Sequence, residues 1–213
     1  MKKIPKSHPR YESLMTREKI VKGVELGITS QHGLIAQGRG EAFDYLIKER
    51  TTEKAKKKIK KAAKLLLKAK YPVISVNGNV AVLAPKEVIG LSKLIPAKLE
   101  VNIFHKSKER EERIKEWLIK YGAKEVLMPE KPLIKFIEHN RRFCNPEGIA
   151  KADVVFVPLE DGDRCKALIK MKKKVITVDL NPMSRTAKAA TVTIVDNITR
   201  ALPLLIEEIK KLK

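Results

Sequence analysis

The sequence predicts an α/β protein with a Rossmann-like parallel sheet, covered by helices on both faces and preceded by an N-terminal helical segment. From residue 71 onward, short apolar runs rich in β-branched residues alternate with amphipathic segments, as in parallel sheets with helical crossovers. Two runs, Val175–Val178 and Thr191–Val195, end in polar residues just before a helix start. The 213 residues, 43% of them hydrophobic, suffice for one core. We therefore expect a single domain over 1–213, with an arm and helices in 1–70 and the Rossmann-like core in 71–213.

The strong positive charge raises the question of nucleic-acid binding. The formal net charge is +21, and clustered cations displace counterions from phosphate backbones. Most of the cations are lysines, however, and aromatic residues that could stack on bases are few. Many lysines fall in Thr51–Lys70, where small and aliphatic residues at helical spacing form an apolar stripe and lysines fill the other face. We interpret this segment as a helix with a solvated lysine face, so nucleic acid is an unlikely partner. A lysine-rich, cysteine-poor composition is also typical of hyperthermophiles.

Nothing in the sequence predicts a membrane protein or an exported one. No stretch approaches the roughly 18 apolar residues of a membrane helix, and the N-terminus MKKIPKSHPR lacks a signal-peptide core. Cys144 and Cys165 are far apart, without a partner at metal-ligand spacing. This pattern suits a reducing cytoplasm and argues against structural zinc. We therefore expect a cytoplasmic protein.

The N-terminal segment predicts a proline-punctuated arm followed by two helices. Thr16 is expected to cap a helix from Arg17 to about Leu26, with Ile20, Val21 and Val24 facing inward. Ser30 is expected to cap a second helix over 31–50. Its inward face would comprise the apolar residues at helical spacing, which are Leu34, Ile35, Ala42, Phe43, Leu46 and Ile47.

Gly38-Arg39-Gly40 interrupts the second helix near its middle. Each interior glycine costs a helix about 1 kcal/mol relative to alanine. Either another helix packs closely at this point, or the bare backbone lets a phosphate approach Arg39. The pattern alone does not separate the two.

The middle of the chain predicts further strand and helix units. Pro72–Val76 is an expected strand that ends in Asn77-Gly78-Asn79, either a hairpin turn or a strand–loop–helix unit whose helix starts near Ala84. The next expected strands are 98–104, a short 125–127 and 153–158, with a charged helix over 107–121. Residues 128–146 form no readable element and are expected to be a lid or a partner surface.

The carboxyl ends of these strands would bring polar side chains to one edge of the sheet, where open parallel sheets bind ligands. Asp161 and Asp163 bracket a glycine between strand and helix, so they suit magnesium, an amine or ordinary helix capping. The protein ligands of magnesium stay unknown at this stage. The full set at the edge is Asn77, Asn79, Asn102, His105, Asp161, Asp163, Asp179, Asn181, Arg185, Thr186, Asp196 and Asn197, with Arg17 and Arg39 from the N-terminal helices.

This mixture of groups favours a phosphorylated ligand. Arginines bind phosphates bidentately, helix N-termini attract anions, and carboxylates suit ribose hydroxyls or a metal. No GxGxxG follows a predicted strand, no GxxxxGK[ST] is present, and no nucleophile-elbow motif occurs. A dehydrogenase, a P-loop ATPase and an α/β-hydrolase are therefore disfavoured, and ATP is the expected ligand.

Several long blocks carry a family resemblance. IPKSHPRYESLMTREKIVKG, GITSQHGLIAQGRGEAFDYL, PVISVNGNVA, VNIFH, ADVVFVPLEDGDR and VDLNPMSRTA resemble the archaeal phosphopantothenate synthetase family, also called 4-phosphopantoate–beta-alanine ligase. The resemblance spans nearly the whole chain apart from 128–145. It implies a homodimeric coenzyme A biosynthetic enzyme that condenses 4-phosphopantoate with β-alanine, using ATP and Mg²⁺ and releasing AMP and diphosphate through an acyl adenylate.

The resemblance also implies roles for individual residues. The ATP-binding positions fall on Arg17, Arg39, Asp179, Leu180, Asn181, Arg185, Thr186, Asn197 and Ile198. Our hypothesis for the reaction assigns catalytic positioning of phosphopantoate to His105 and Asn102. It assigns substrate binding to Asn77, Asn79, Asp161 and Asp163. A different ATP-dependent acid–amine ligase and a nucleic-acid-binding module are the alternatives.

Overall fold

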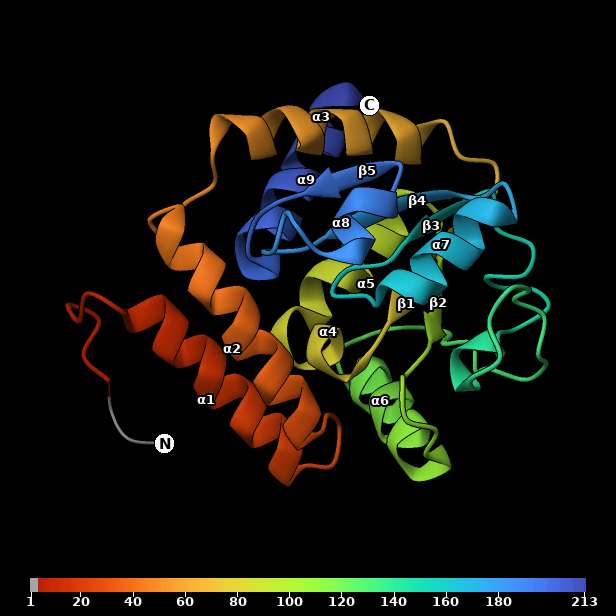
Figure 1. Ribbon diagram of the computed structural model, residues 1–213, viewed down its shortest axis with the longest axis horizontal. Coiled ribbons are helices and arrows are strands. Elements are labelled where there is room, and N and C mark those ends of the chain that lie inside the picture. The colour runs from red at the N-terminus through yellow and green to blue at the C-terminus, as the bar shows by residue number, and fades with distance from the viewer. Residues whose placement is uncertain (1–3) are drawn as a thin grey trace.

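The computed structural model describes residues 4–213, which contain one five-stranded sheet (Figure 1). All neighbouring strands are parallel and their spatial order is β2-β1-β3-β4-β5. This is the doubly wound order in which the chain reverses direction across the sheet between β1 and β3. The α/β prediction is therefore confirmed. The strands are β1 (Pro72–Val76), β2 (Lys98–Val101), β3 (Val154–Phe156), β4 (Lys174–Val178) and β5 (Val192–Ile194).

Helices cover both faces of the sheet. Alternate residues of each strand point to opposite faces, so Ile74 and Val76 join one buried cluster while Val73 joins the other. The first face carries α3 (Glu53–Leu67), α4 (Gly78–Leu83), α5 (Pro85–Leu94), α6 (Lys108–Lys120) and α9 (Ile198–Leu212). The second carries α7 (Gly162–Lys170), α8 (Arg185–Ala189) and part of the segment between β2 and β3, which includes the short 3₁₀ helix Asn140–Arg142.

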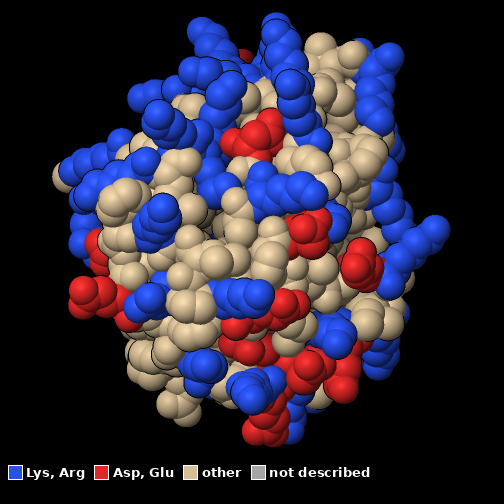
Figure 2. All heavy atoms as spheres, turned by 90° about the vertical axis from the view of Figure 1, so that its right-hand side faces the viewer, with Lys and Arg blue, Asp and Glu red and all other residues tan. Residues whose placement is uncertain are grey.

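Helix α3 agrees with its sequence pattern. Thr52 caps it by accepting a hydrogen bond from the amide of Ala55 at 3.1 Å. Its predicted apolar stripe packs against α9 and β5, with Ile59 and Leu66 almost fully buried. The lysines project outward, and Figure 2 shows lysine and arginine side chains gathered at the upper end of the molecule, where α3 lies in Figure 1.

The first helix differs from its prediction. Helix α1 (Tyr11–Glu25) begins six residues before Arg17, so Thr16 lies inside it and donates its hydroxyl to the carbonyl of Glu12 at 2.8 Å. The cap at Thr16 was therefore wrong. Ile20 is buried as expected, but Val21 is 38% exposed.

Helix α2 (Gln31–Leu46) is oriented opposite to its apolar pattern. It runs unbroken through Gly38-Arg39-Gly40, and the side chain of Ser30 makes no capping hydrogen bond. Its buried residues are the polar Gln37, Glu41 and Asp44, whereas Ile35 is 62% and Leu46 78% exposed. Of the predicted inward face, Leu34 packs against the core, but the fully buried residues of α2 are polar, so the prediction was wrong for most of the helix.

Three predictions about connections also needed correction. Asn77 is followed directly by α4 rather than by a hairpin or an open loop, whereas the helix predicted to start near Ala84 is confirmed as α5. Strand β2 ends at Val101, short of the predicted 104, and within 4–213 the segment 125–127 contributes a single bridge, from Leu127 to Glu100, instead of a strand. Residues 128–146 are largely irregular, and one antiparallel bridge from Lys131 to Cys144 ties their ends together.

No helix in the described part of the chain is long and apolar enough to cross a membrane. Cys144 and Cys165 are both buried and free.

Candidate active site

A cleft of about 580 Å³ opens at the carboxyl edge of the sheet, next to the point between β1 and β3 where the strand order reverses. Open parallel sheets bind their ligands at this position. The walls come from the first half of α2, the ends of β1, β3 and β4, the loop after β2 and the start of α8. The lining residues are Thr29, Ser30, His32, Gly33, Ala36, Gln37, Arg39, Gly40, Asn77, Gly78, Asn79, Ile103, Phe104, His105, Arg110, Arg141, Leu159, Glu160, Asp161, Gly162, Asp179, Leu180, Asn181, Ser184, Arg185 and Thr186.

Asn77 and Asn79 line the floor of the cleft, but their amides are used within the protein. Asn77 caps α4 through its side-chain oxygen, and its Nδ2 reaches the carbonyl of Leu159 at 3.0 Å across the strand reversal. Asn79 accepts the hydroxyl of Thr29 at 2.6 Å and donates to the carbonyl of Gly33 at 2.9 Å. The two asparagines therefore hold the walls of the cleft in place.

A buried ion network forms the wall beside α7. Glu160 accepts hydrogen bonds from both Arg141 and Arg164. Asp161 caps α7 through the amide of Arg164 and pairs with Nε of Arg141 at 3.0 Å. Burial acts to raise the pKa of Asp161, but Arg141 and these hydrogen bonds lower it overall. Asp161 is thus held as a carboxylate at the mouth of the cleft.

The loop from Asp179 to Ser184 forms the opposite wall. Asp179 accepts the amide of Asn181 at 2.9 Å and the hydroxyl of Ser184, which itself caps α8. Burial raises the pKa of Asp179. Leu180 packs against Gly40 of α2, and the hydroxyl of Thr186 donates to the carbonyl of Glu160 at 2.8 Å.

The glycines beside Arg39 leave the helix surface open. A Cβ added at Gly38 would meet nothing within 4 Å, and one at Gly40 would make ordinary contact with Leu180 at 3.4 Å. Close packing within this chain does not explain them. Gly40 lines the cleft together with Arg39, whereas Gly38 does not.

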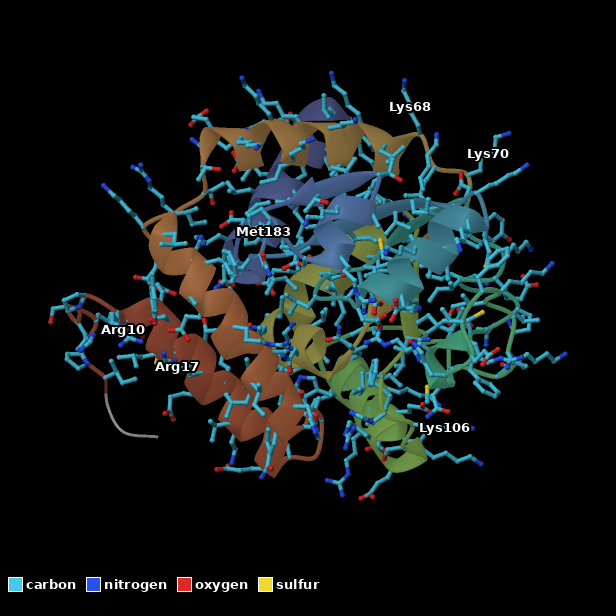
Figure 3. All side chains as sticks on the ribbon, in the orientation of Figure 1. Arg10, Arg17, Lys68, Lys70, Lys106 and Met183 are labelled. Atoms are coloured by element: carbon cyan, nitrogen blue, oxygen red, sulfur yellow. The ribbon has the colours of Figure 1, made fainter. Side chains whose placement is uncertain are left out.

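The remaining predicted residues divide into those in the cleft and those outside it. His105 lines the cleft, and its ring centroid lies 5.0 Å from that of His32. Arg17 lies on α1, outside the cleft, and pairs with Glu41 of α2 at 2.7 Å (Figure 3). Asp163 lies at the rim and binds Arg185 through both oxygens.

Four other predicted residues do not line the cleft. Asn102 is 2% exposed and donates to the carbonyl of Phe143 at 2.9 Å. Asn197 caps α9 by accepting the amide of Thr199, and Ile198 is packed in the core. Asp196, next to them, is likewise buried, in an ion cluster with Arg200 and Asp44.

Sequence reasoning missed several residues of the site. His32 and Arg110 carried no motif. Arg141 lies in the unreadable segment 128–146, so its approach to the cleft was not visible. A useful signal for His32 was its place in the first turn of a helix adjoining the glycine-interrupted stretch.

His139, Asp161 and Asp163 bring one ligand atom each within 4.8 Å of one another. The carboxylates suit a hard cation, but imidazole does not suit magnesium, which prefers oxygen ligands. Both carboxylates are also paired with arginines. The three residues do not make a ready magnesium site.

Comparison with known proteins gives a consistent result. Residues 54–213 match the family model described as phosphopantothenate/pantothenate synthetase. The chain is 54% identical over 215 residues to a 4-phosphopantoate–beta-alanine ligase of Thermococcus kodakarensis, covering 100% of this chain and 82% of that protein. It is 56% identical over 202 residues to the protein of the same name from Methanosarcina mazei, covering 95% and 80% of the two chains.

Proposed function

The chain belongs to the phosphopantothenate/pantothenate synthetase family, and we propose on that premise that it is an ATP-dependent ligase condensing 4-phosphopantoate with β-alanine in coenzyme A biosynthesis. The observation that carries the proposal is the cleft at the strand reversal. Its arginines suit phosphates and its half-buried Asp179 suits a ribose hydroxyl. The cleft also holds six of the nine ATP-binding positions that the family resemblance implies, which are Arg39, Asp179, Leu180, Asn181, Arg185 and Thr186.

In the proposed reaction, the carboxylate of phosphopantoate attacks the α-phosphorus of ATP in line, and diphosphate leaves. The amine of β-alanine then attacks the acyl adenylate and releases AMP. The chain contributes by aligning three reactants, which lowers the entropic part of the barrier. Arg39 lines the cleft and neutralises phosphate charge. No covalent nucleophile of the protein is required.

Magnesium is expected to accompany the nucleotide. It binds ATP mainly through phosphate oxygens and water, and needs few protein ligands. Asp161 and Asp163 already pair with Arg141 and Arg185. The proposed reaction therefore uses no metal held by these two carboxylates.

We also propose that the protein is a homodimer, with the second copy covering the exposed apolar face of α2. Ile35, Leu46 and Met183 are 62%, 78% and 67% exposed and come from α2 and the neighbouring loop. Apolar side chains grouped in this way commonly mark protein interfaces. Sedimentation should give a dimer for the unmodified protein and for the control Leu212→Glu, and a monomer for Leu46→Glu. A monomeric unmodified protein would disprove the proposal.

The activity is tested by incubating the protein with magnesium, ATP, 4-phosphopantoate and β-alanine, omitting each in turn, and measuring AMP and ADP. We expect AMP only when both co-substrates are present. ADP instead would replace the adenylate by an acyl phosphate. If the folded protein forms neither, the proposed activity is wrong.

A matched pair of variants tests the nucleotide assignment. Arg39→Gln removes a charged partner of phosphate and should lower kcat/KM for ATP about ten- to hundredfold. Arg50→Gln removes an arginine just beyond α2 and outside the cleft, so it should leave the value unchanged. Equal effects of the two variants would contradict the assignment.

A further inference from the structure

The cleft has two ends that are defined by helix α2. His32 and Gly33 of its first turn line one end, and Arg39 and Gly40 line the other. Seven residues separate His32 from Arg39, which corresponds to about 10 Å along a helix axis. The loop Asp179–Ser184 lies against the Arg39 end through the contact of Leu180 with Gly40. His32 and Arg39 therefore offer two separate positions along the cleft.

The arginines of the cleft fall into two groups, those with a carboxylate partner and those without. The arginines that line the cleft are Arg39, Arg110, Arg141 and Arg185. Arg141 is neutralised by Glu160 and Asp161, and Arg185 by Asp163. Within residues 4–213, Arg39 and Arg110 form no salt bridge. Two guanidinium groups therefore remain for anions bound from solution.

Arg110 lines the cleft five positions after His105, whose ring lies beside that of His32. It belongs to the first turn of α6, and its backbone amide is fixed by the hydroxyl of Ser107 at 3.2 Å. His32 and His105 lie together at 5.0 Å between ring centroids, and His105 follows β2 in the loop that leads into α6. One guanidinium and two imidazoles supply several hydrogen-bond donors, the complement that a phosphate monoester with its three terminal oxygens requires.

We propose that Arg110, assisted by His32 and His105, binds the phosphate group of the acid substrate, while Arg39 at the other end serves the nucleotide. The proposal rests on the ligase function proposed above and extends it to residues that the family motifs do not mark. The acid lies between the two ends, with its phosphate at Arg110 and its carboxylate directed toward the nucleotide. Arg110 would then be the residue that distinguishes phosphopantoate from unphosphorylated pantoate.

The test measures binding and turnover in Arg110→Gln and in the control Arg113→Gln. Arg113 lies one turn further along α6, pairs with Glu109 at 2.6 Å and is outside the cleft. In calorimetric titrations with 4-phosphopantoate, we expect Arg110→Gln to weaken binding about ten- to hundredfold. The Kd and the KM for ATP should stay unchanged. The preference for phosphopantoate over pantoate in turnover should fall by a similar factor, and Arg113→Gln should behave as the unmodified protein.

The outcomes separate the two proposals. Unaltered phosphopantoate binding in a folded Arg110→Gln, or an equal loss of ATP binding, would overturn the assignment of Arg110. An unmodified protein that binds phosphopantoate through Arg110 but forms no AMP or ADP would retain the phosphate site and contradict the ligase. His105→Ala supplies a second test, since it should weaken phosphopantoate binding without changing that of ATP.

Discussion

Helices α2 and α3 follow each other in the chain but are attached to the protein by different forces. Helix α3 buries an apolar stripe against α9 and β5 and leaves its lysines in water. Helix α2 buries Gln37, Glu41 and Asp44 and leaves Ile35 and Leu46 in water. Asp44 binds Arg200 of α9, and Gly33 accepts a hydrogen bond from Asn79. Apolar periodicity predicts orientation only for a helix that docks through apolar contact within its own chain.

The way in which α2 is attached also matters for the cleft. Polar groups fix α2 at defined points, and the same helix supplies His32 and Arg39 to the cleft. A hydrogen-bonded contact fixes distance and angle more strictly than apolar packing does. The site is therefore built on the helix whose position is specified by directional bonds.

The largest expected effect comes from breaking the polar attachment of α2. Arg200→Ala leaves Asp44 and Asp196, 3% and 0% exposed in their side chains, without a counter-ion. Breaking such a buried pair costs about 3–5 kcal/mol in the free energy of unfolding. Lys211→Ala on the same helix removes an exposed pair with Glu207 and should cost under about 1 kcal/mol. Urea unfolding measures both, and equal losses would show that α2 does not depend on the ion cluster.

A second experiment compares the same residue type on the two helices. Leu66 of α3 is 2% exposed and Leu46 of α2 is 78% exposed. Leu66→Ala should lower the free energy of unfolding by about 2–5 kcal/mol, because it empties a packed site. At a protein concentration low enough to favour monomers, Leu46→Ala should change it by less than about 0.5 kcal/mol. A large loss at Leu46 in the monomer would mean that the exposed face packs within the chain.

A third experiment concerns another segment attached through polar groups, the one that precedes β3. Glu100 of β2 is fully buried and accepts the amides of Asn145 at 3.0 Å and Ile149 at 2.6 Å. Burial raises its pKa from 4.5 to about 7. Between these values the unfolded chain loses the proton and the folded one keeps it. The contribution of Glu100 to the free energy of unfolding is therefore fully present below pH 4.5. It falls by about 3 kcal/mol as the pH rises through 7.

Denaturation at pH 5 and pH 8 measures this effect as the difference between the unmodified protein and Glu100→Gln. The variant is expected to be less stable at pH 5, because its amide NH₂ faces a backbone N–H. Between pH 5 and pH 8, however, its free energy of unfolding should fall less than that of the unmodified protein, because glutamine does not titrate. Parallel pH profiles would show that Glu100 is not the group responsible.

Much of the fold was predictable because strands and the turns after them are encoded by short stretches of neighbouring residues. β-Branched runs gave the strands β1, β3, β4 and β5, and the polar residues after them gave the cleft edge. The orientation of α2 was not predictable, because Asp44 meets Arg200 across 156 positions of sequence. Arg141 was missed for the same reason, since irregular chain brings it to Glu160. His32 and Arg110 become neighbours of the cleft only when α2 and α6 are packed.

The lysine face of α3 has a consequence for the rate at which ligands arrive. A net charge of +21 surrounds the protein with a positive potential, which speeds diffusional encounter with anions and is screened within about 8 Å at physiological ionic strength. The proposed substrates ATP and 4-phosphopantoate are polyanions, whereas β-alanine is a neutral zwitterion. Added salt should therefore slow the association of ATP and 4-phosphopantoate and leave that of β-alanine unaffected. The lysines would then raise the association rate of anionic substrates although they do not contact the cleft.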